Sequence, residues 1–238
     1  MNVYEIKTIG ERIINNPYVG RGIVAGLSAD GKKAVAAYFI MGRSANSRNR
    51  VFTEKNGEIF TEPFDPSKVE DPSLIIYAAI RQTKNKLIVT NGDQTDTVFD
   101  ALSSDVCPIR ALKSRRFEPD APNFTPRISA ILSLGDHFGY KMSILKSADV
   151  NGTACNRFTF DYEALPGVGH FIHTYVTDGN PLPTFMGEPE RVVIPDDVDE
   201  FTNDIWNSLD EQNKISLYVR YIDLFSGAEQ SRLINKNK

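Results

Sequence analysis

The chain has little cysteine, little histidine and no long run of apolar residues. Its 238 residues include two cysteines and three histidines. Two thiols supply neither a disulfide framework nor a structural zinc site. No apolar run reaches the roughly 18 residues that a helix needs to cross a membrane. These absences exclude a disulfide-stabilised scaffold, and we expect no membrane partner.

A basic excess is also missing. The formal net charge is −4 and the sequence pI is near 5.5. Proteins that bind nucleic acid without sequence preference usually carry excess positive charge, so we expect no nucleic-acid partner. Residues 1–13 mix both charges and have no long apolar core. We therefore expect no signal peptide and a cytoplasmic location.

No linker, internal repeat or low-complexity tract divides the sequence. The composition is 41% hydrophobic and 24% charged, which provides material for a large core and argues against disorder. We expect residues 1–238 to form a single domain.

Turn residues separate many short segments of strand character. Two hairpins are expected, around Ala29–Gly31 and around Asn56-Gly57. Further strands are expected at 87–90, 127–134, 140–147, 155–162, 170–177 and 215–225. Helices are expected at 74–82 after an Asp71-Pro72 start signal, at 93–103 and at 199–209. Long loops are expected at 114–126 and 178–190. The pattern predicts an α+β protein with mostly antiparallel sheets and helices outside them.

The segment 41–50 concentrates arginine among hydroxyl and amide side chains. Its arginines are Arg43, Arg48 and Arg50, and Ser44 and Ser47 lie between them. Guanidinium groups bind phosphates through paired hydrogen bonds, so the cluster favours an anion site. Because the chain is acidic overall, one bound phosphate fits better than a polyanion. The alternative is that these side chains are simply solvated.

The segment 90–97 groups small polar side chains around one glycine. Asn91-Gly92 predicts a turn, which would aim polar groups at a site beside the start of the next helix. The alternative is that Asp93 or Thr95 only caps that helix. Together, the two polar segments suggest a small, phosphorylated, polar substrate.

The remaining reactive residue types give weaker signals. His170 and His173 are an odd number of residues apart, so a regular strand places them on opposite faces, which is poor geometry for a shared metal. We expect Cys107 and Cys155 to be buried small groups rather than nucleophiles. The sequence offers no metal-binding cluster.

Several motifs occur in order over residues 18–175: Tyr18-x-Gly20-Arg21, Arg43-Ser44 followed by Arg48, Tyr77-x-x-x-Arg81, Asn91-Gly92-x-x-Thr95-Asp96-Thr97, Glu118-x-Asp120 followed by Thr125-Pro126-Arg127-Ile128, and Thr174-Tyr175. In these residues the chain resembles the archaeal-type IMP cyclohydrolases, single-activity enzymes of purine biosynthesis. The resemblance implies a four-layer α/β/β/α sandwich similar to the N-terminal-nucleophile hydrolases.

The resemblance also implies an activity, a hydrolase acting on carbon–nitrogen bonds in cyclic amidines. The reaction closes the ring of 5-formamidoimidazole-4-carboxamide ribotide (FAICAR) to give IMP and water. It needs no metal and no organic cofactor, and a homo-oligomer is compatible with it. Tyr77 and Glu118 become the candidates for proton handling. The alternatives are that Tyr77, on an apolar helix face, belongs to the core, as such residues more often do, and that Glu118 only solubilises its loop. The candidates for nucleotide binding are Arg21, Arg43, Ser44, Arg48, Asn91, Asp93, Thr95, Asp96 and Arg127.

The chain departs from this family in extra N-terminal residues, in a longer 105–124 region and in the loop 178–190, which leaves a shifted substrate open. Two other functions also stay open. An amide hydrolase of the N-terminal-nucleophile type needs a Cys, Ser or Thr at its mature terminus. Here Met1 precedes Asn2, and the nearest residue of these three types is Thr8. The other alternative is a nucleotide-binding relative without turnover.

Overall fold

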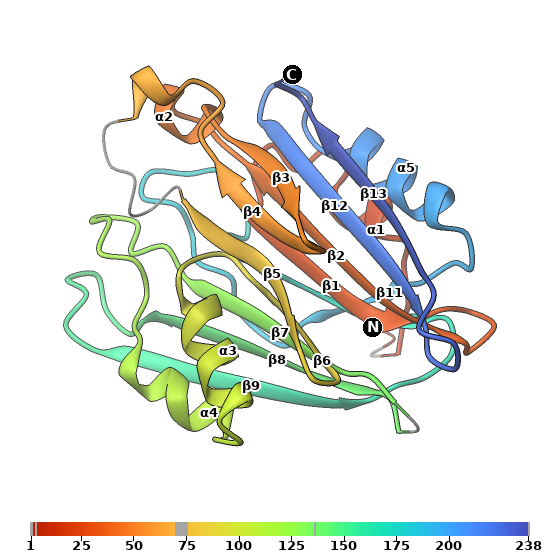
Figure 1. Cartoon of the computed structure of the whole chain (residues 1–238). Helices are drawn as coiled ribbons and strands as arrows, with labels where there is room; N and C mark the ends of the chain where they lie inside the picture. Colours follow the sequence, from red (N-terminus) through yellow and green to blue (C-terminus); the bar gives the residue numbers. More distant parts are fainter. Residues whose placement is uncertain (1, 3, 70–75, 136, 238) are drawn as a thin grey trace.

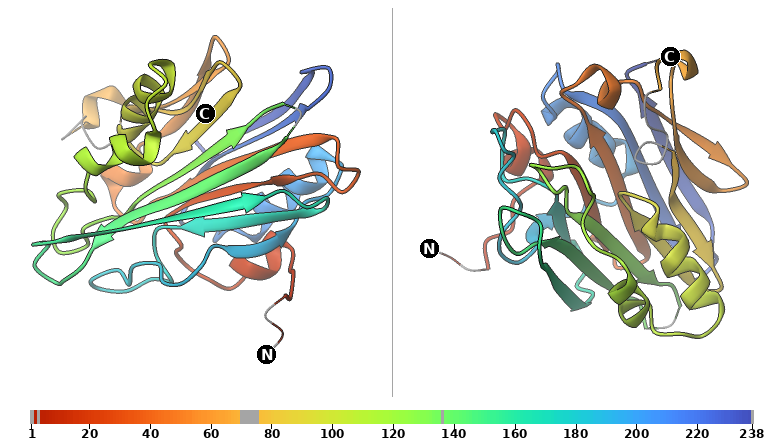
Figure 2. Two further views of the ribbon diagram at one scale, coloured as in Figure 1. Left: turned by 90° about the horizontal axis from the view of Figure 1, so that it is seen from below. Right: turned by 90° about the vertical axis from the view of Figure 1, so that its left-hand side faces the viewer.

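The computed structural model describes residues 2, 4–69, 76–135 and 137–237 (Figure 1). Two antiparallel sheets pack face to face, and helices cover the outer face of each sheet (Figure 2). This confirms the expected α+β class with mostly antiparallel sheets.

The first sheet has six strands in the order β11-β10-β1-β2-β12-β13, and all its neighbours are antiparallel. Its strands are β1 (Arg21–Leu27), β2 (Lys33–Met41), β10 (Val168–His173), β11 (Glu190–Val193), β12 (Lys214–Asp223) and β13 (Glu229–Asn235). Every residue of β1 is buried, because the strand is covered on both faces.

The second sheet has seven strands that follow one another in the chain. They are β3 (Val51–Lys55), β4 (Glu58–Glu62), β5 (Tyr77–Thr83), β6 (Lys86–Thr90), β7 (Arg127–Ser133), β8 (Gly139–Ser147) and β9 (Cys155–Glu163). Each strand pairs antiparallel with the next, so the sheet is a meander whose two borders are β3 and β9.

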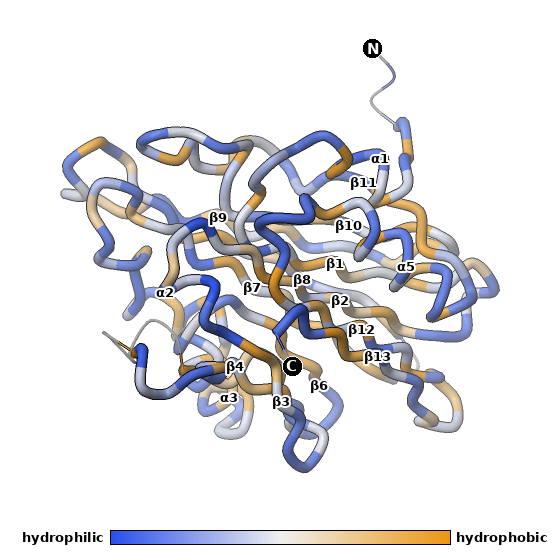
Figure 3. The backbone as a smooth tube through the Cα atoms, turned by 90° about the horizontal axis from the view of Figure 1, so that it is seen from above, coloured by the Kyte–Doolittle hydropathy of each residue, from blue (hydrophilic) through white to orange (hydrophobic). Residues whose placement is uncertain are grey.

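Three hydrophobic clusters hold these layers together. The central cluster lies between the sheets and includes Ile23, Tyr38 and Ile128. A second cluster lies between the first sheet and two helices, α1 (Ile9–Ile13) and α5 (Val198–Ser208). A third lies between the second sheet and the helical segments α3 (Gln94–Ser103) and η3 (Leu112–Ser114). The short helix α4 (Pro108–Ala111) connects these two segments without a residue in the cluster. In Figure 3 the apolar stretches of chain follow the strands, and the hydrophilic stretches gather in the connections.

Local chemistry explains the helix ends. Asp197 starts α5, because its carboxylate accepts the main-chain N–H groups of Asp199 and Glu200, each at 2.8 Å. Gly10 lets α1 approach α5 closely, since a Cβ at this position would lie 2.2 Å from Oδ1 of Asp204. Two further short helices, α2 (Ala45–Arg48) and η1 (Pro66–Lys68), lie near the end of the sandwich where β1 begins.

Most of the expected elements are confirmed, including both hairpins, the helices at 93–103 and 199–209, and the four strands between 127 and 177. The expected helix at 74–82 is wrong, because residues 77–83 form strand β5. Tyr77 to Ile80 is a continuous apolar run that is buried on both faces between β4 and β6, and such a run has no period that separates strand from helix. Asp71-Pro72 lies outside the described residues.

The cysteine and histidine expectations had mixed outcomes. Cys107 is exposed at the start of α4 and Cys155 is half-buried on a border strand, so the expectation that both are buried is wrong. The two histidines do point to opposite faces of β10. His170 stacks on Tyr162 between the sheets, whereas His173 stacks on Phe171, which belongs to the cluster under the helices. No helix in the described ranges is long and apolar enough to cross a membrane.

Candidate active site

A cavity of about 330 Å³ opens at the end of the sandwich where β1 begins. Four segments line it: the start of β1, the turn and short helix at 43–50, the loop at 118–125, and the loop that follows β10. Its lining residues are Tyr18, Arg21, Arg43, Ser44, Asn46, Ser47, Arg50, Glu118, Asp120, Asn123, Thr125, Tyr175 and Leu182. The lining is rich in charged and hydrogen-bonding side chains, which is typical of a site for a polar ligand.

Two buried arginines of the cavity lining carry donors that have no partner within the protein. Arg21 is 7% exposed and Arg50 is 5% exposed. The Nε of Arg21 and the Nε and Nη1 of Arg50 have no hydrogen-bond partner among the described residues, and the same holds for Oδ1 of Asn46. Buried polar groups normally have partners, so this group of four unsatisfied atoms in one lining needs an explanation, for which a bound polar ligand or water is the ordinary candidate.

The charges of these arginines are unevenly balanced. Burial lowers the pKa of Arg50, and the neighbouring Arg21 guanidinium lowers it further. Burial also acts to lower the pKa of Arg21, but Glu118 and nearby tyrosines outweigh this effect and raise it. Glu118 therefore compensates Arg21 more fully than Arg50. An anion bound beside Arg50 would relieve the repulsion between the two arginines.

Glu118 is a buried carboxyl group on the loop after η3. It is 3% exposed, and its main-chain N–H donates to the carbonyl of Thr125 at 2.8 Å, which fixes the loop. Burial raises the pKa of Glu118, while the charges of Arg21 and Arg127 act in the opposite direction. A carboxyl group with a raised pKa, beside unused donors in a cavity, is suited to proton transfer.

The neighbouring residues of this loop are held in place by one another. The Asp120 carboxylate accepts the main-chain N–H of Thr125 at 2.6 Å and also its hydroxyl hydrogen. The hydroxyl groups of Thr125 and Tyr175 are hydrogen-bonded to each other. These contacts connect the 118–125 loop to the segment after β10 and so fix two walls of the cavity.

Tyr77, the first residue of β5, lies close enough to Arg21 and Arg50 to act on their charges. Its hydroxyl is 2.8 Å from the hydroxyl of Tyr38 on β2, and this contact joins the two sheets. Burial, together with Tyr77, raises the pKa of Tyr38 well above its ordinary value. Tyr77 is not part of the cavity lining, but it interacts electrostatically with both Arg21 and Arg50.

Arg43 and Ser44 stand at the mouth of the cavity. Arg43 forms an ion pair with Asp178, donates to the carbonyl of Gly179 at 3.0 Å and lies over the ring of Tyr18. Ser44 caps α2, where its Oγ accepts the N–H of Ser47 at 3.1 Å. Unlike Arg50, Arg43 already has a partner for its charge.

Arg48 lies apart from the cavity. Its Nε donates to the carbonyl of Gly42 at 3.0 Å, and its Nη2 donates to Oδ1 of Asn213 at 2.9 Å. These bonds tie α2 to the segment before β12, and Arg48 does not belong to the cavity lining.

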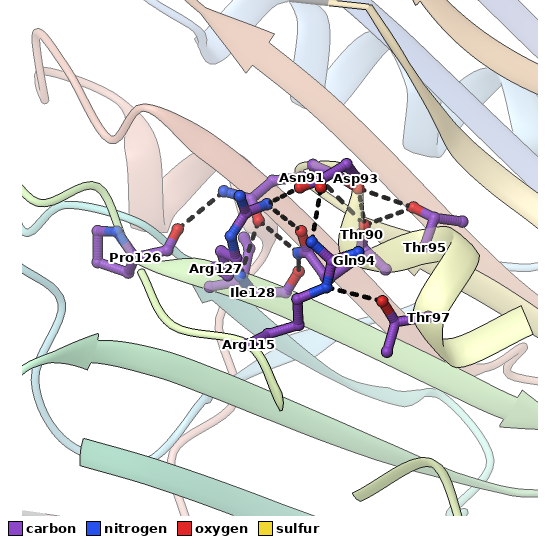
Figure 4. Close-up of polar contacts among 11 residues, drawn as sticks. Thr90, Asn91, Asp93, Gln94, Thr95, Thr97, Arg115, Pro126, Arg127 and Ile128 are labelled. Carbon is purple, nitrogen blue, oxygen red and sulfur yellow. Dashed lines mark hydrogen bonds and ion pairs between the residues drawn. The ribbon is translucent and has the colours of Figure 1, made fainter. Parts of the chain in front are cut away.

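The predicted polar cluster after Thr90 is a separate feature, which we call the Asn91 network (Asn91, Asp93, Gln94 and Arg127; Figure 4). Asn91 is fully buried and donates to the carbonyl of Pro126 at 2.9 Å. Its Oδ1 accepts the N–H of Ile128 at 2.8 Å and the amide hydrogen of Gln94 at 3.0 Å. Asn91 thereby fastens the end of β6 to the start of β7.

Charged residues complete this network. The Asp93 carboxylate pairs with Arg127 at 2.6 Å and with Arg115 at 2.7 Å, and Arg127 also donates to Oε1 of Gln94 at 2.7 Å (Figure 4). Nearby, the Thr95 hydroxyl bonds that of Thr90, and Asp96 pairs with Arg81. The structure thus brings the 91–96 and 126–128 segments together, but their side chains are not part of the cavity lining.

Sequence reasoning missed part of the lining. Arg50 was noticed within its cluster but not selected, and Asn46 was not selected either. Tyr18, Asp120, Thr125 and Tyr175 all lie inside the ordered motifs, and that position was the available signal. Among the described residues, no group of three or more His, Cys, Asp or Glu side chains is arranged to hold a metal ion.

Comparison with known proteins assigns the chain to a family. The sequence profile of the family described as "IMP cyclohydrolase-like protein" matches residues 18–227, which include every segment of the cavity. The chain belongs to this family. Sequences of family members called IMP cyclohydrolase align with part of it.

Three relatives with this name come from archaea. The IMP cyclohydrolase of Methanopyrus kandleri is 39% identical over 118 residues, that of Methanothrix thermoacetophila 34% over 120 residues, and that of Methanococcus aeolicus 32% over 121 residues. These alignments cover 48% or 49% of this chain and 58% of each relative, so the chain matches a little more than half the length of these proteins.

Proposed function

We propose that this chain is an IMP cyclohydrolase that converts FAICAR to IMP and water. The observation that carries the proposal is one cavity lining that combines Arg21 and Arg50, which keep donors without protein partners, with the buried carboxyl group of Glu118, on which both arginines act electrostatically. Such a site suits a phosphorylated substrate whose reaction moves protons. Family membership and the names of the relatives support the same activity.

The order of the layers, two sheets between outer helices, is compatible with this assignment. We propose that the two face-to-face sheets with outer helices correspond to the sandwich of the N-terminal-nucleophile hydrolases. The cavity lies at one end of this sandwich, where the start of β1 and the segment after β10 both line it.

The charges of the lining residues suggest how the substrate is oriented in the cavity. The 5′-phosphate lies on the side of Arg43, Ser44 and Arg50, where Arg50 lacks a partner and the Ser44 hydroxyl can still donate its hydrogen. The base, with its carboxamide and formyl groups, lies on the side of Arg21, Glu118 and Tyr77. This placement keeps the phosphate away from the Glu118 carboxylate, which would repel it.

The reaction forms one carbon–nitrogen bond and loses one water. The carboxamide nitrogen attacks the formyl carbon, and holding the two groups together supplies much of the rate, since pre-oriented attack can contribute about 7–11 kcal/mol. Glu118 accepts the proton that the attacking carboxamide nitrogen loses and passes it to the formyl oxygen, which becomes a hydroxyl group. The formamido nitrogen then loses its own proton, and Glu118 delivers a proton to that hydroxyl as it leaves as water and the carbon–nitrogen double bond forms. Arg21, which lines the cavity, donates a hydrogen bond to the formyl oxygen as negative charge develops on it. We propose that the hydroxyl of Tyr77, which does not line the cavity of the free protein, reaches the same oxygen once the substrate is bound.

The other predicted residues act on the fold rather than on the substrate. Arg48 ties α2 to Gly42 after β2 and to Asn213 before β12. The Asn91 network holds β6 against β7. Thr95 and Asp96 support the start of α3 through Thr90 and Arg81. Arg127 reaches the site only through its charge, which acts on the pKa of Glu118.

A steady-state assay tests the proposal. Purified protein is mixed with FAICAR, and the formation of IMP is followed by ultraviolet absorbance. We expect turnover that saturates with FAICAR and needs no added metal. If FAICAR and IMP bind without turnover, the chain is a nucleotide-binding relative. If neither binds, the assignment is wrong.

A further inference from the structure

Strand β9 leaves a long border of its sheet open. It pairs with β8 along its whole length, from Gly139 opposite Glu163 to Ser147 opposite Cys155, with no shift in register. No described strand pairs with its other side (Figure 1). An open border strand offers a row of main-chain donors and acceptors to another strand. We propose that β9 pairs antiparallel with β9 of a second copy of this chain, with Thr159 on the two-fold axis.

The other three borders are shorter or better protected. Strand β11 has four residues, and Lys7 of the N-terminal segment bridges to its Val192. Strand β3 has five residues. On β13, Arg232 is held by Asp199 of α5, and the side chain of Asn235 bonds the main chain of Phe52. Only β9 combines nine residues, a regular register and an uncovered side.

The sequence of β9 is complementary to itself around Thr159. An antiparallel pair centred there places Arg157 opposite Asp161 of the other copy, twice, and Phe158 opposite Phe160. No two like charges face each other. The same operation on β13, centred at Arg232, would place Arg232 opposite itself. Charge complementarity therefore selects β9 and identifies a second copy as the partner.

The two faces of β9 add different contributions to this pairing. Phe158 and Phe160 lie on the face toward the other sheet, where Phe160 packs against the central cluster and Phe158 remains 45% exposed. Pairing would cover Phe158 with the partner copy's aromatic side chain. On the opposite face, the Asp161 side chain is 67% exposed and pairs with Lys141. The Arg157 guanidinium donates to the main-chain carbonyls of Lys113 at 3.3 Å and Arg115 at 2.8 Å, so the pair across the axis would add to or replace these bonds within each copy.

Charge reversal tests the pairing. We expect the wild-type protein to be a dimer in sedimentation equilibrium at micromolar concentration. Arg157→Asp alone, or Asp161→Arg alone, places like charges opposite each other and should shift the protein to monomer. Combining both substitutions restores opposite charges and should restore the dimer, a result that misfolding could not produce. Gln230→Asp on the β13 border is the control and should leave the dimer intact.

Cross-linking tests the register. In a Cys107→Ser/Cys155→Ser background, Thr159→Cys places two thiols next to each other at the axis, and mild oxidation should link the copies. Asn156→Cys is the matched control, because its two copies would be about 20 Å apart at ~3.4 Å per residue and should not link. A monomeric wild-type protein would overturn the proposal. A dimer that ignores the charge reversals and does not link at position 159 would overturn it equally.

Discussion

The cavity and the Asn91 network use the same kinds of side chain in opposite ways. In the network, the Asn91 amide and the Asp93 carboxylate bond neighbouring protein groups, and Arg127 is paired twice (Figure 4). In the cavity, Arg21 and Arg50 are as deeply buried but keep donors without partners. A polar cluster whose members are all hydrogen-bonded stabilises the fold, whereas donors without protein partners remain able to bond a ligand. The comparison therefore distinguishes a satisfied structural cluster from the cavity that we propose as the substrate site.

The largest expected effect comes from Glu118→Gln in the cavity. Turnover of FAICAR should fall by roughly 100-fold or more, because the variant loses its proton-transfer group but keeps its shape. Burial raises the pKa of Glu118, so the wild-type rate should fall as the pH drops through that raised value. The variant should lack this acidic limb. The exposed Glu54→Gln on β3 is the control, and near-full turnover in Glu118→Gln would refute the assignment.

The same substitution predicts a stability effect of defined sign. The folded-state pKa of Glu118 is raised, so its contribution to stability is fully present below the unfolded-state pKa and is lost as the pH rises through the folded-state pKa. Glu118→Gln should therefore melt above wild type at neutral pH, and the difference should close in acid. Thermal melts across pH measure this. A variant that melts below wild type at neutral pH would contradict the stated direction.

Asn91→Ala tests the structural role of the Asn91 network. It leaves the buried carbonyl of Pro126 and the N–H of Ile128 without partners, at a cost of about 2–4 kcal/mol in the free energy of unfolding. Turnover per folded molecule should stay close to wild type. Urea unfolding and the FAICAR assay measure the two quantities, with the exposed Asn151→Ala as the control. A stable variant with lost turnover would instead place Asn91 at the substrate.

A matched pair of arginine substitutions sharpens the contrast. Arg50→Met removes an unpaired buried charge, so the free protein should not lose stability, while IMP binding should weaken by roughly 10–100-fold. Arg127→Met leaves Asp93 and Gln94 with lost partners, so the protein should lose stability with a smaller effect on binding. Calorimetry and thermal melts report both. The reverse pattern would mean that the two regions have been assigned the wrong way round.

The smallest effects are expected at the tyrosine pair. Tyr77→Phe should lower turnover by about 10-fold, since it removes one hydrogen bond to the developing charge. Tyr38→Phe should have a smaller effect on turnover and leave the Michaelis constant unchanged, because Tyr38 acts only by orienting the Tyr77 hydroxyl. If Tyr38→Phe is the more damaging of the two, Tyr77 is not the group that contacts the substrate.

The fold was predictable wherever local chemistry decides the structure. Asn56-Gly57 marks its hairpin, and the residues around Asp93 mark the start of α3. Prediction failed at β5, where burial on both faces removes the alternation that identifies a strand. It also missed β13, a border strand whose mostly polar sequence carries little hydrophobic signal.

The site was predictable only to the level of segments. Arg48 and Arg50 are two residues apart in the same cluster, and nothing local distinguishes them. Asn213, which lies far along the chain, satisfies Arg48, while no described residue satisfies Nε or Nη1 of Arg50. The partners of a polar side chain depend on which distant segments meet it, and this is information that spacing along the chain does not carry.

A crystal structure with bound IMP tests the central claim most directly. The account predicts IMP in the cavity, with a phosphate oxygen within hydrogen-bonding distance of Arg50 and the base beside Arg21 and Glu118. The Asn91 network should keep every bond that it has in the free protein. IMP bound against Asn91 and Arg127 instead, with the Arg50 donors still unpaired, would contradict the account.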